Sequence, residues 1–206
     1  MELYMGTGGY TNYDWKGIIY PPGAPSSEFL EAYAPHFNAV ELNTSFYNIP
    51  GKKAFEGMVR KSDGRVRFAV KAHRSMTHER STDEGGFRQL RASVKSLRAA
   101  RVLGPFLAQF SWSFHRTPDH SRYLLDLVSR FEGEALAIEF RNPEWHTSEV
   151  EASLRDQGVA WVSVDYPEIA GMGSRRRVTT LPIAYNRLDG NRFGPSASSK
   201  SPLPTS

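Results

Sequence analysis

The sequence predicts an α/β fold of the TIM-type (β/α) barrel class, with about seven of the eight strands of such a barrel present in this chain. Three observations lead to this prediction. Short apolar runs alternate with amphipathic segments, and neighbouring runs start roughly 25–35 residues apart, about the length of one βαβ unit. Most runs also place large apolar residues on one face and small or charged residues on the other. Such alternation indicates a parallel sheet.

Seven segments have the composition of strands. They are Leu3–Thr7, Ala39–Asn43, Arg67–Lys71, Phe106–Phe110, Leu136–Arg141, Ala160–Asp165 and Ile183–Arg187. Successive side chains of a strand point to opposite faces, so each strand presents two sets of residues. The second strand, for example, has Val40 and Leu42 on one face and Ala39, Glu41 and Asn43 on the other.

The large apolar residues lie on only one face of most predicted strands, which favours a closed barrel over an open sheet. An open, doubly wound sheet is covered by helices on both faces and is therefore apolar on both. Here we expect the large apolar face to meet the helices and the small side chains to point inward. For the sixth strand this rule places Val162 and Val164 outside and Trp161, Ser163 and Asp165 inside.

Two of the intervening segments have clear helical patterns. A helix over 86–103 is predicted by an apolar stripe, Phe87, Leu90, Val94 and Leu97. A basic stripe lies one residue further round that helix: Arg88, Arg91, Lys95 and Arg98. A second helix is expected to begin at Ser148, which has capping-box spacing to Glu151, and to end at Gly158.

Composition excludes several classes of protein. The 206 residues fit one domain, and the absence of Cys excludes disulfides, thiolate metal sites and cysteine nucleophiles. No apolar run approaches the ~20 residues that a membrane-spanning helix needs. Residues 1–4 lack the basic region and apolar stretch of a signal peptide. We therefore expect a cytoplasmic protein that does not associate with a membrane.

The net charge of +4 is unevenly distributed. Between Arg60 and Arg101 the chain has 12 Lys and Arg against four Asp and Glu. Such a basic excess suits an anionic partner, either nucleic acid or a phosphorylated small molecule. The alternative is a helix face that is simply solvated.

Polar and charged side chains cluster at the C-terminal ends of the predicted strands, where barrel enzymes place their chemistry. The candidate catalytic residues are Glu41, Lys71, Glu139 and Asp165. The candidate ligand-binding residues are Asn43, Tyr47, His73, Gln109, Arg141, Trp145 and Arg187. Arginine and lysine would hold a phosphate or carboxylate, and Glu41 or Glu139 would be the general base. Alternatively, the charges neutralise one another in a buried structural network.

No metal or cofactor site is predicted. The carboxylates could bind Mg²⁺ or Mn²⁺, but the adjacent cations would compete for them. His73, His78 and His146 have no ligand spacing, and nucleotide-binding glycine motifs and the G-x-S-x-G motif are absent.

Several blocks of sequence occur in the order found in a known family. They are Gly6–Tyr10, Asp14–Gly17, Val40–Tyr47, Phe68–Ala72, Met76–Glu79, Ile138–Trp145 and Tyr185–Gly190. With these blocks the chain resembles the YecE-like family (domain of unknown function 72, DUF72) over about residues 3–192. The resemblance implies a TIM-type barrel. It implies no reaction, because none is established for the family.

Family members continue into a further helix and a last strand. Here residues 193–206 are rich in Ser and Pro, with Leu203 as the large apolar residue of the stretch after Pro195. We expect a barrel domain over 1–192 and a disordered tail over 193–206. The resemblance thus predicts a C-terminal truncation. An interrupted reading frame explains it most simply, and completion of the barrel by another subunit is the alternative.

These observations predict a protein that binds an anionic ligand (phosphorylated, sugar-like or nucleic acid) at the C-terminal mouth of the barrel. They leave its enzymatic status and oligomeric state open. The alternatives are a non-catalytic nucleic-acid-binding module that uses the helix over 86–103, and an inactive truncated chain.

Overall fold

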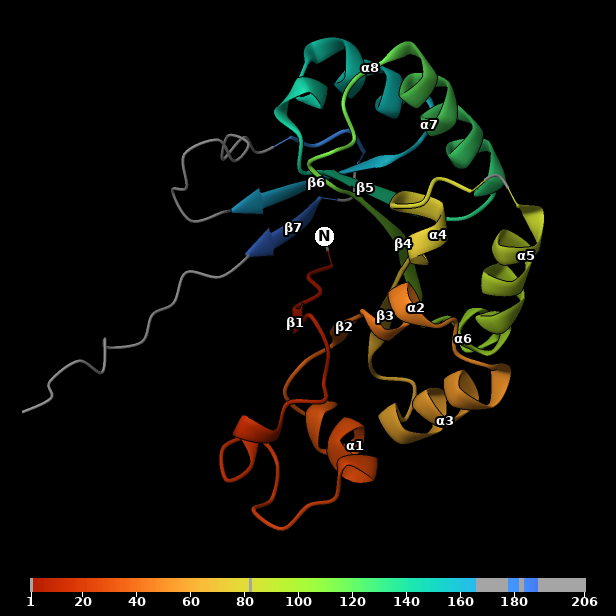
Figure 1. Ribbon diagram of the computed structural model, residues 1–206. Coiled ribbons are helices and arrows are strands. Elements are labelled where there is room, and N and C mark those ends of the chain that lie inside the picture. The colour runs from red at the N-terminus through yellow and green to blue at the C-terminus, as the bar shows by residue number, and fades with distance from the viewer. Residues whose placement is uncertain (1, 82, 166–177, 182–183, 189–206) are drawn as a thin grey trace, which may run out of the picture.

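The computed structural model describes residues 2–81, 83–165, 178–181 and 184–188. Within them, seven strands form one parallel sheet in the order of the chain. The strands are β1 (Gly6–Thr7), β2 (Ala39–Leu42), β3 (Arg67–Lys71), β4 (Leu103–Phe110), β5 (Leu136–Phe140), β6 (Ala160–Asp165) and β7 (Tyr185–Leu188). The sheet curls into a partial barrel, with β1 and β7 at its edges (Figure 1). The predicted α/β barrel architecture is confirmed. The expected tail over 193–206 lies outside the described residues.

Helices follow the strands and line the outside of the curled sheet (Figure 1). They are α1 (Phe29–Tyr33), α2 (Thr44–Tyr47), α3 (Lys52–Ser62), α4 (Arg74–Thr77), α5 (Glu84–Ser93), α6 (Lys95–Ala99), α7 (Pro118–Arg130) and α8 (Ser148–Asp156). Three short 3₁₀ helices cover Tyr13–Trp15, Ser26–Glu28 and Pro143–Trp145. None of the helices in the described part of the chain is long and apolar enough to cross a membrane.

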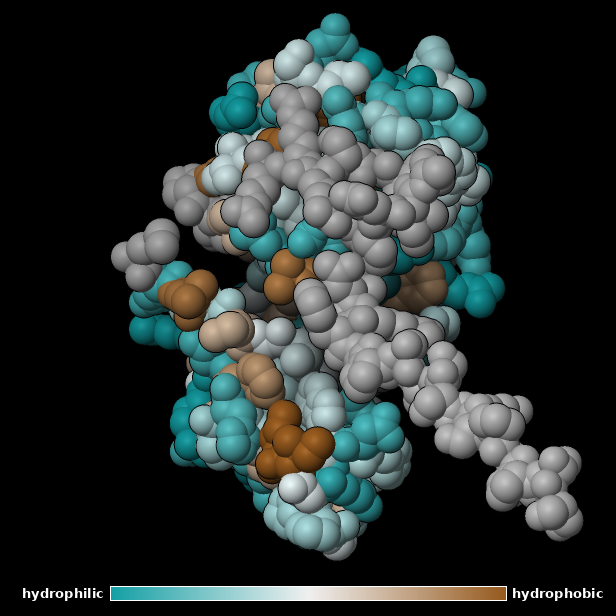
Figure 2. Space-filling view, turned by 90° about the vertical axis from the view of Figure 1, so that its left-hand side faces the viewer, coloured by the Kyte–Doolittle hydropathy of each residue, from teal (hydrophilic) through white to brown (hydrophobic). Residues whose placement is uncertain are grey.

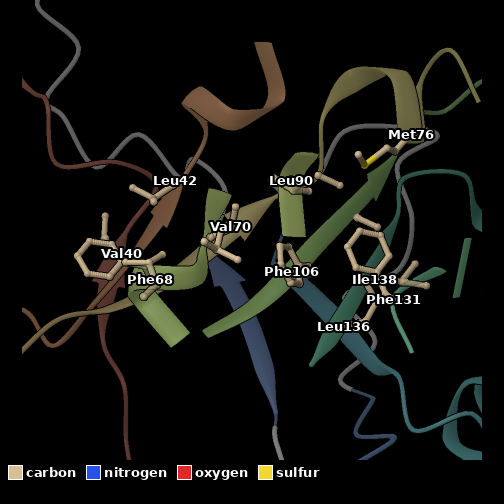
Figure 3. Close-up of a cluster of buried hydrophobic side chains, with 14 of the residues drawn as sticks. Val40, Leu42, Phe68, Val70, Met76, Leu90, Phe106, Phe131, Leu136 and Ile138 are labelled. Atoms are coloured by element: carbon tan, nitrogen blue, oxygen red, sulfur yellow. The ribbon is translucent and has the colours of Figure 1, made fainter. Parts of the chain in front are cut away.

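The main hydrophobic core lies between the sheet and the helices. Figure 3 shows alternate strand residues in this core, including Val40, Phe68, Phe106 and Ile138, which are almost completely buried. They belong to the face that strand alternation predicts to be apolar in β2 to β5. On the coloured part of the face in Figure 2, hydrophilic residues predominate, and hydrophobic residues are exposed in a few patches.

A second, smaller core fills the concave side of the sheet. It consists of Leu107, Ala137, Ala160, Val162 and Val164. The register pairs Ala137 with Ala160 and Ile138 with Trp161, so Ala160 shares the inner face with Ala137.

The predicted orientation of β6 is therefore wrong. Val162 and Val164 point inward, and Trp161 packs outside, with its ring 5.4 Å from that of Phe140. The inner wall needs medium-sized side chains here, whereas the large indole fits between sheet and helices. Asp165 has the same parity as Trp161 and is exposed.

Two predicted helix boundaries also change. The helix expected over 86–103 is interrupted at Val94 (φ −84°, ψ 9°), and the break gives α5 and α6. Val94 and Leu97 stay fully buried, so the break redirects the second segment while keeping its apolar side on the core. The cap of α8 is Thr147, one residue before the predicted Ser148, because the Thr147 side chain accepts a bond from the amide of Val150.

The close approach of β1 to β2 depends on Gly6. A Cβ atom at this position would lie 1.9 Å from the carbonyl oxygen of Ala39. We expect Gly6→Ala to lower the free energy of unfolding by about 1–3 kcal/mol, since the backbone must shift. Gly23→Ala is the matched control, because a Cβ atom at Gly23 meets nothing within 4 Å. Urea unfolding of both variants checks this, and equal stabilities would contradict it.

Candidate functional site

Charged and polar side chains converge on the inner face near the C-terminal ends of five strands. They are Glu41 of β2, Lys71 of β3, Gln109 of β4, Glu139 of β5 and Arg187 of β7. In the register, Gln109 lies opposite Glu139, and Arg187 lies opposite the inward-pointing Val164. Because the sheet is curled, β7 reaches residues of β2 and β5 across the concave side.

Arg187 connects the two buried carboxylates. Its Nε atom lies 3.1 Å from Oε2 of Glu41, and its Nη1 atom donates to Oε2 of Glu139. The side chains of Glu41 and Glu139 are only 7% and 0% exposed. Buried carboxylates require compensating partners, and the guanidinium group offers several donors in a fixed plane. One cation therefore serves two anions.

Two consecutive hydrogen bonds link Lys71 to Glu139 through Gln109. Its Nζ atom donates to Oε1 of Gln109 at 2.8 Å, and Nε2 of Gln109 donates to Oε1 of Glu139 at 2.7 Å. The Phe46 ring centroid lies 5.0 Å from the ammonium group. Burial is the largest effect on the pKa of Lys71 and lowers it. Glu41 partly opposes this effect.

Tyr185 is a site residue that strand composition alone did not single out. Its hydroxyl donates to Oε2 of Glu41 at 3.0 Å. Burial, and then the charge of Glu41, raise its pKa well above the ordinary value, so the phenol stays protonated. Tyr185 lies two residues before Arg187 in β7, so both side chains point to the same face of the sheet. This spacing could have identified Tyr185 from the sequence. The other carboxylate oxygen of Glu41, Oε1, is buried and has no hydrogen-bond partner in the described structure.

Two further cationic or basic side chains lie near the network. Arg141 is 44% exposed, and its Nε atom is 3.7 Å from Oε1 of Glu139. Burial lowers the pKa of His78, and the charges of Lys71, Arg141, Arg80 and Arg74 lower it further. His78 packs edge-on against Phe46, with 4.9 Å between ring centroids. It was not among the predicted site residues, since its position depends on the turn of α4 rather than on a strand.

Three predicted residues lie in the segments that follow β2 and β3: Asn43 and His73 directly precede α2 and α4, and Tyr47 is the last residue of α2. Asn43 donates to the carbonyl of Gly8 at 3.2 Å, and Tyr47 is 73% exposed. His73 caps α4 through Ser75, and its Nε2 atom lies 3.3 Å from the carbonyl oxygen of Tyr47. All three thus belong to these segments and have no contact with the charged network among the described residues.

Two predicted residues are not brought to the site. Asp165 lies on the opposite face of β6, as described above. Trp145 is 2% exposed and stacks between Phe114 and Phe140, with centroid distances of 5.0 and 4.9 Å. Its Nε1 atom donates to the carbonyl of Phe114. Both faces of the indole are covered, so Trp145 packs the outside of β5 and offers no surface to a ligand.

The predicted basic stripe on one continuous helix does not form. The break at Val94 separates Arg88 and Arg91 from the two basic residues of α6. Arg91 is bound to the carbonyl of Arg130 and to Glu84, and Arg98 pairs with Glu134. Two of the four cations thus have intramolecular partners.

The inner site has an excess of positive charge. Among the described residues it combines Lys71, Arg141 and Arg187 with Glu41 and Glu139. Within the same residues, no group of three or more His, Cys, Asp or Glu is arranged to hold a metal ion. The arrangement offers two cations near the opening, a buried carboxylate oxygen that can accept a hydrogen bond, and a protonated phenol.

Comparisons with known proteins identify related chains. Residues 4–202 match a family model described as "Protein of unknown function DUF72". The UPF0759 protein YunF of Bacillus subtilis is 30% identical over 200 residues, which cover 92% of this chain and 67% of YunF. A crystal structure of a DUF72 family protein from Thermotoga maritima has a TM-score of 0.82 and 33% identity, covering 92% of this chain and 75% of that one. For a DUF72 family protein from Enterococcus faecalis, the values are 0.79 and 22%, with 96% and 74% covered.

The double bridge through Arg187 should dominate the stability of the site. We expect Arg187→Met to lower the free energy of unfolding by about 3–5 kcal/mol, because two buried carboxylates lose their shared partner. Arg122→Met is the control, since Arg122 and its partner Asp119 are 76% and 81% exposed. The free energy of unfolding of the Arg122→Met variant should fall by less than about 1 kcal/mol. Chemical unfolding checks both, and a small effect of Arg187→Met would show that the bridge does not hold the sheet.

Proposed function

This chain belongs to the DUF72 family of proteins of unknown function, and we propose that it binds an anionic small molecule, phosphorylated or sugar-like, at the C-terminal mouth of its partial barrel. The observation that carries the proposal is the distribution of partners within the charged network. Among the described residues, Arg187 is the cation that pairs with both buried carboxylates. Lys71 and Arg141 are therefore available to an incoming anion.

The hydrogen-bond partners of Lys71 and Arg141 support the proposal that both side chains are available to an anion. Lys71 donates to a neutral amide, and no carboxylate of the described residues lies within ion-pair distance of it. Arg141 approaches Glu139 only to 3.7 Å and is nearly half exposed. A guanidinium group in this state can form two parallel bonds to a phosphate or carboxylate.

The local electrostatic field supports the same proposal. Burial is the largest effect that lowers the pKa of His78, and four nearby cations lower this pKa further, which is consistent with a positive potential around the ring. A concave, partly desolvated region whose charges have one sign attracts and concentrates ligands of the opposite charge. The site also lies at the C-terminal ends of the strands, where the loops of a βα-barrel form ligand sites.

Substitution of the two available cations should weaken anion binding. We expect Lys71→Met and Arg141→Ala each to weaken binding of inorganic phosphate about 10- to 100-fold, since each removes a charge-assisted hydrogen bond. Isothermal titration calorimetry at fixed ionic strength measures this. Lys52→Met is the control, because Lys52 is 67% exposed and pairs only with Glu56 among the described residues.

Two results would contradict the proposal. One is equal weakening in the Lys52→Met control, which would indicate nonspecific attraction. The other is binding of a DNA oligonucleotide that is lost in Arg88→Ala and retained in Arg141→Ala. That outcome would instead favour a nucleic-acid surface on α5. A rise in the pKa of His78 on addition of phosphate, followed by NMR, would support the site directly.

A further inference from the structure

We propose that Lys71 is a nucleophile that forms an imine, and that the ligand of the mouth is an anionic aldehyde or ketone. This inference rests on the proposed anion site and names the class of its substrate. Arg141 would hold the anionic group, and the carbonyl carbon would reach the Nζ atom of Lys71.

The surroundings of Lys71 suit an amine that reacts as a nucleophile. An ammonium group has no lone pair, so a reactive lysine must lose its proton easily. Gln109 gives Lys71 a neutral hydrogen-bond partner at 2.8 Å, and the Phe46 ring covers it at 5.0 Å. Neither partner stabilises the cation as strongly as a bound carboxylate would. Burial together with the charges of Arg187 and Arg141 favours the neutral amine, against the opposing effect of Glu41 and Glu139.

Glu41 offers a place for the proton that the amine releases. Its Oε2 atom is occupied by Tyr185 and Arg187, whereas its Oε1 atom is buried and has no hydrogen-bond partner in the described structure. Of the carboxylates that act on Lys71, Glu41 has the larger effect. An unsatisfied buried acceptor of this kind costs stability, which indicates a group that is completed by a ligand or used in chemistry.

The reaction is balanced without an additional reagent. The Nζ lone pair forms a bond to the carbonyl carbon, while the π electrons of the C=O bond move to oxygen, which takes up a proton. The nitrogen then releases a proton to Glu41. Next, Glu41 returns this proton to the hydroxyl group, which leaves as water while the nitrogen lone pair forms the C=N bond. The protonated imine then releases its remaining N–H proton to solvent, which replaces the proton that the carbonyl oxygen took up from water. One amine and one carbonyl compound give one imine and one water, with no change in oxidation state.

Reductive trapping tests the proposal with two small aldehydes that differ only in charge. The full chain is incubated with glycolaldehyde phosphate or with glycolaldehyde, each with sodium cyanoborohydride, and the modified lysines are mapped by peptide mass spectrometry. We expect Lys71 to be modified ahead of the more exposed Lys52. Glycolaldehyde phosphate should modify it about 10- to 100-fold faster than glycolaldehyde, since the phosphate gains a charge-assisted hydrogen bond to Arg141. Inorganic phosphate should slow this reaction.

Three variants sharpen the test. Lys71→Arg keeps the positive charge and cannot form an imine, so the adduct should disappear while phosphate affinity falls less than in Lys71→Met. Glu41→Gln should slow trapping at Lys71, because the proton acceptor is lost. Lys52→Arg, the matched control, should leave trapping at Lys71 unchanged. Circular dichroism and thermal unfolding establish that each variant is folded.

The outcomes separate this inference from the proposed function. If phosphate binds and depends on Arg141, but modification follows exposure and Lys71 stays unmodified, the imine role is wrong and the anion site stands. If both aldehydes modify Lys71 equally and phosphate neither binds nor protects, the anion site is wrong and the reactive amine stands.

Discussion

The ion pairs of Arg187 with Glu41 and Glu139 join distant parts of the sheet. In the sheet order, β7 is separated by four strands from β2 and by one from β5, so these contacts exist only if the sheet curls. Two carboxylates on the inner face cannot be left without partners, because the desolvation of a charge is costly. The curvature of the sheet and the neutralisation of its interior are thus satisfied together, and Tyr185, two residues before Arg187, adds a second contact from β7 to β2.

The bridge also determines the electrostatic character of the mouth. From sequence, three acidic and three basic side chains at the strand ends could have balanced one another. The structure turns Asp165 to the other face of β6, which removes one negative charge from the inner site. Since Arg187 serves both remaining carboxylates, the positive excess falls on Lys71 and Arg141. The charge of the site therefore follows from the register of β6.

Much of the fold follows from local pattern. Alternation of large apolar and small or charged residues locates β2 to β5 and assigns their faces, because helices cover only one side. The rule fails at β6, where Trp161 and Val162 are both apolar and pairing with β5 decides the face. Side chains placed by turns, such as His78, cannot be located from strand parity. Trp145 follows a strand end as a site residue would, but its indole fills a gap beside Phe114 that only the packed structure contains.

Gln109 explains how a lysine can remain beside two carboxylates without being neutralised by them. Its amide oxygen accepts a hydrogen bond from Lys71, and its amide nitrogen donates one to Glu139. The amide thus links the cation to the anion and contributes no charge of its own. A carboxylate at position 109 would pair directly with Lys71 and raise its pKa. It would also place a third anion beside Glu139, where Arg187 already pairs with two carboxylates. A neutral side chain with one acceptor and one donor is thus the residue type that satisfies both neighbours and keeps the positive charge of the mouth available.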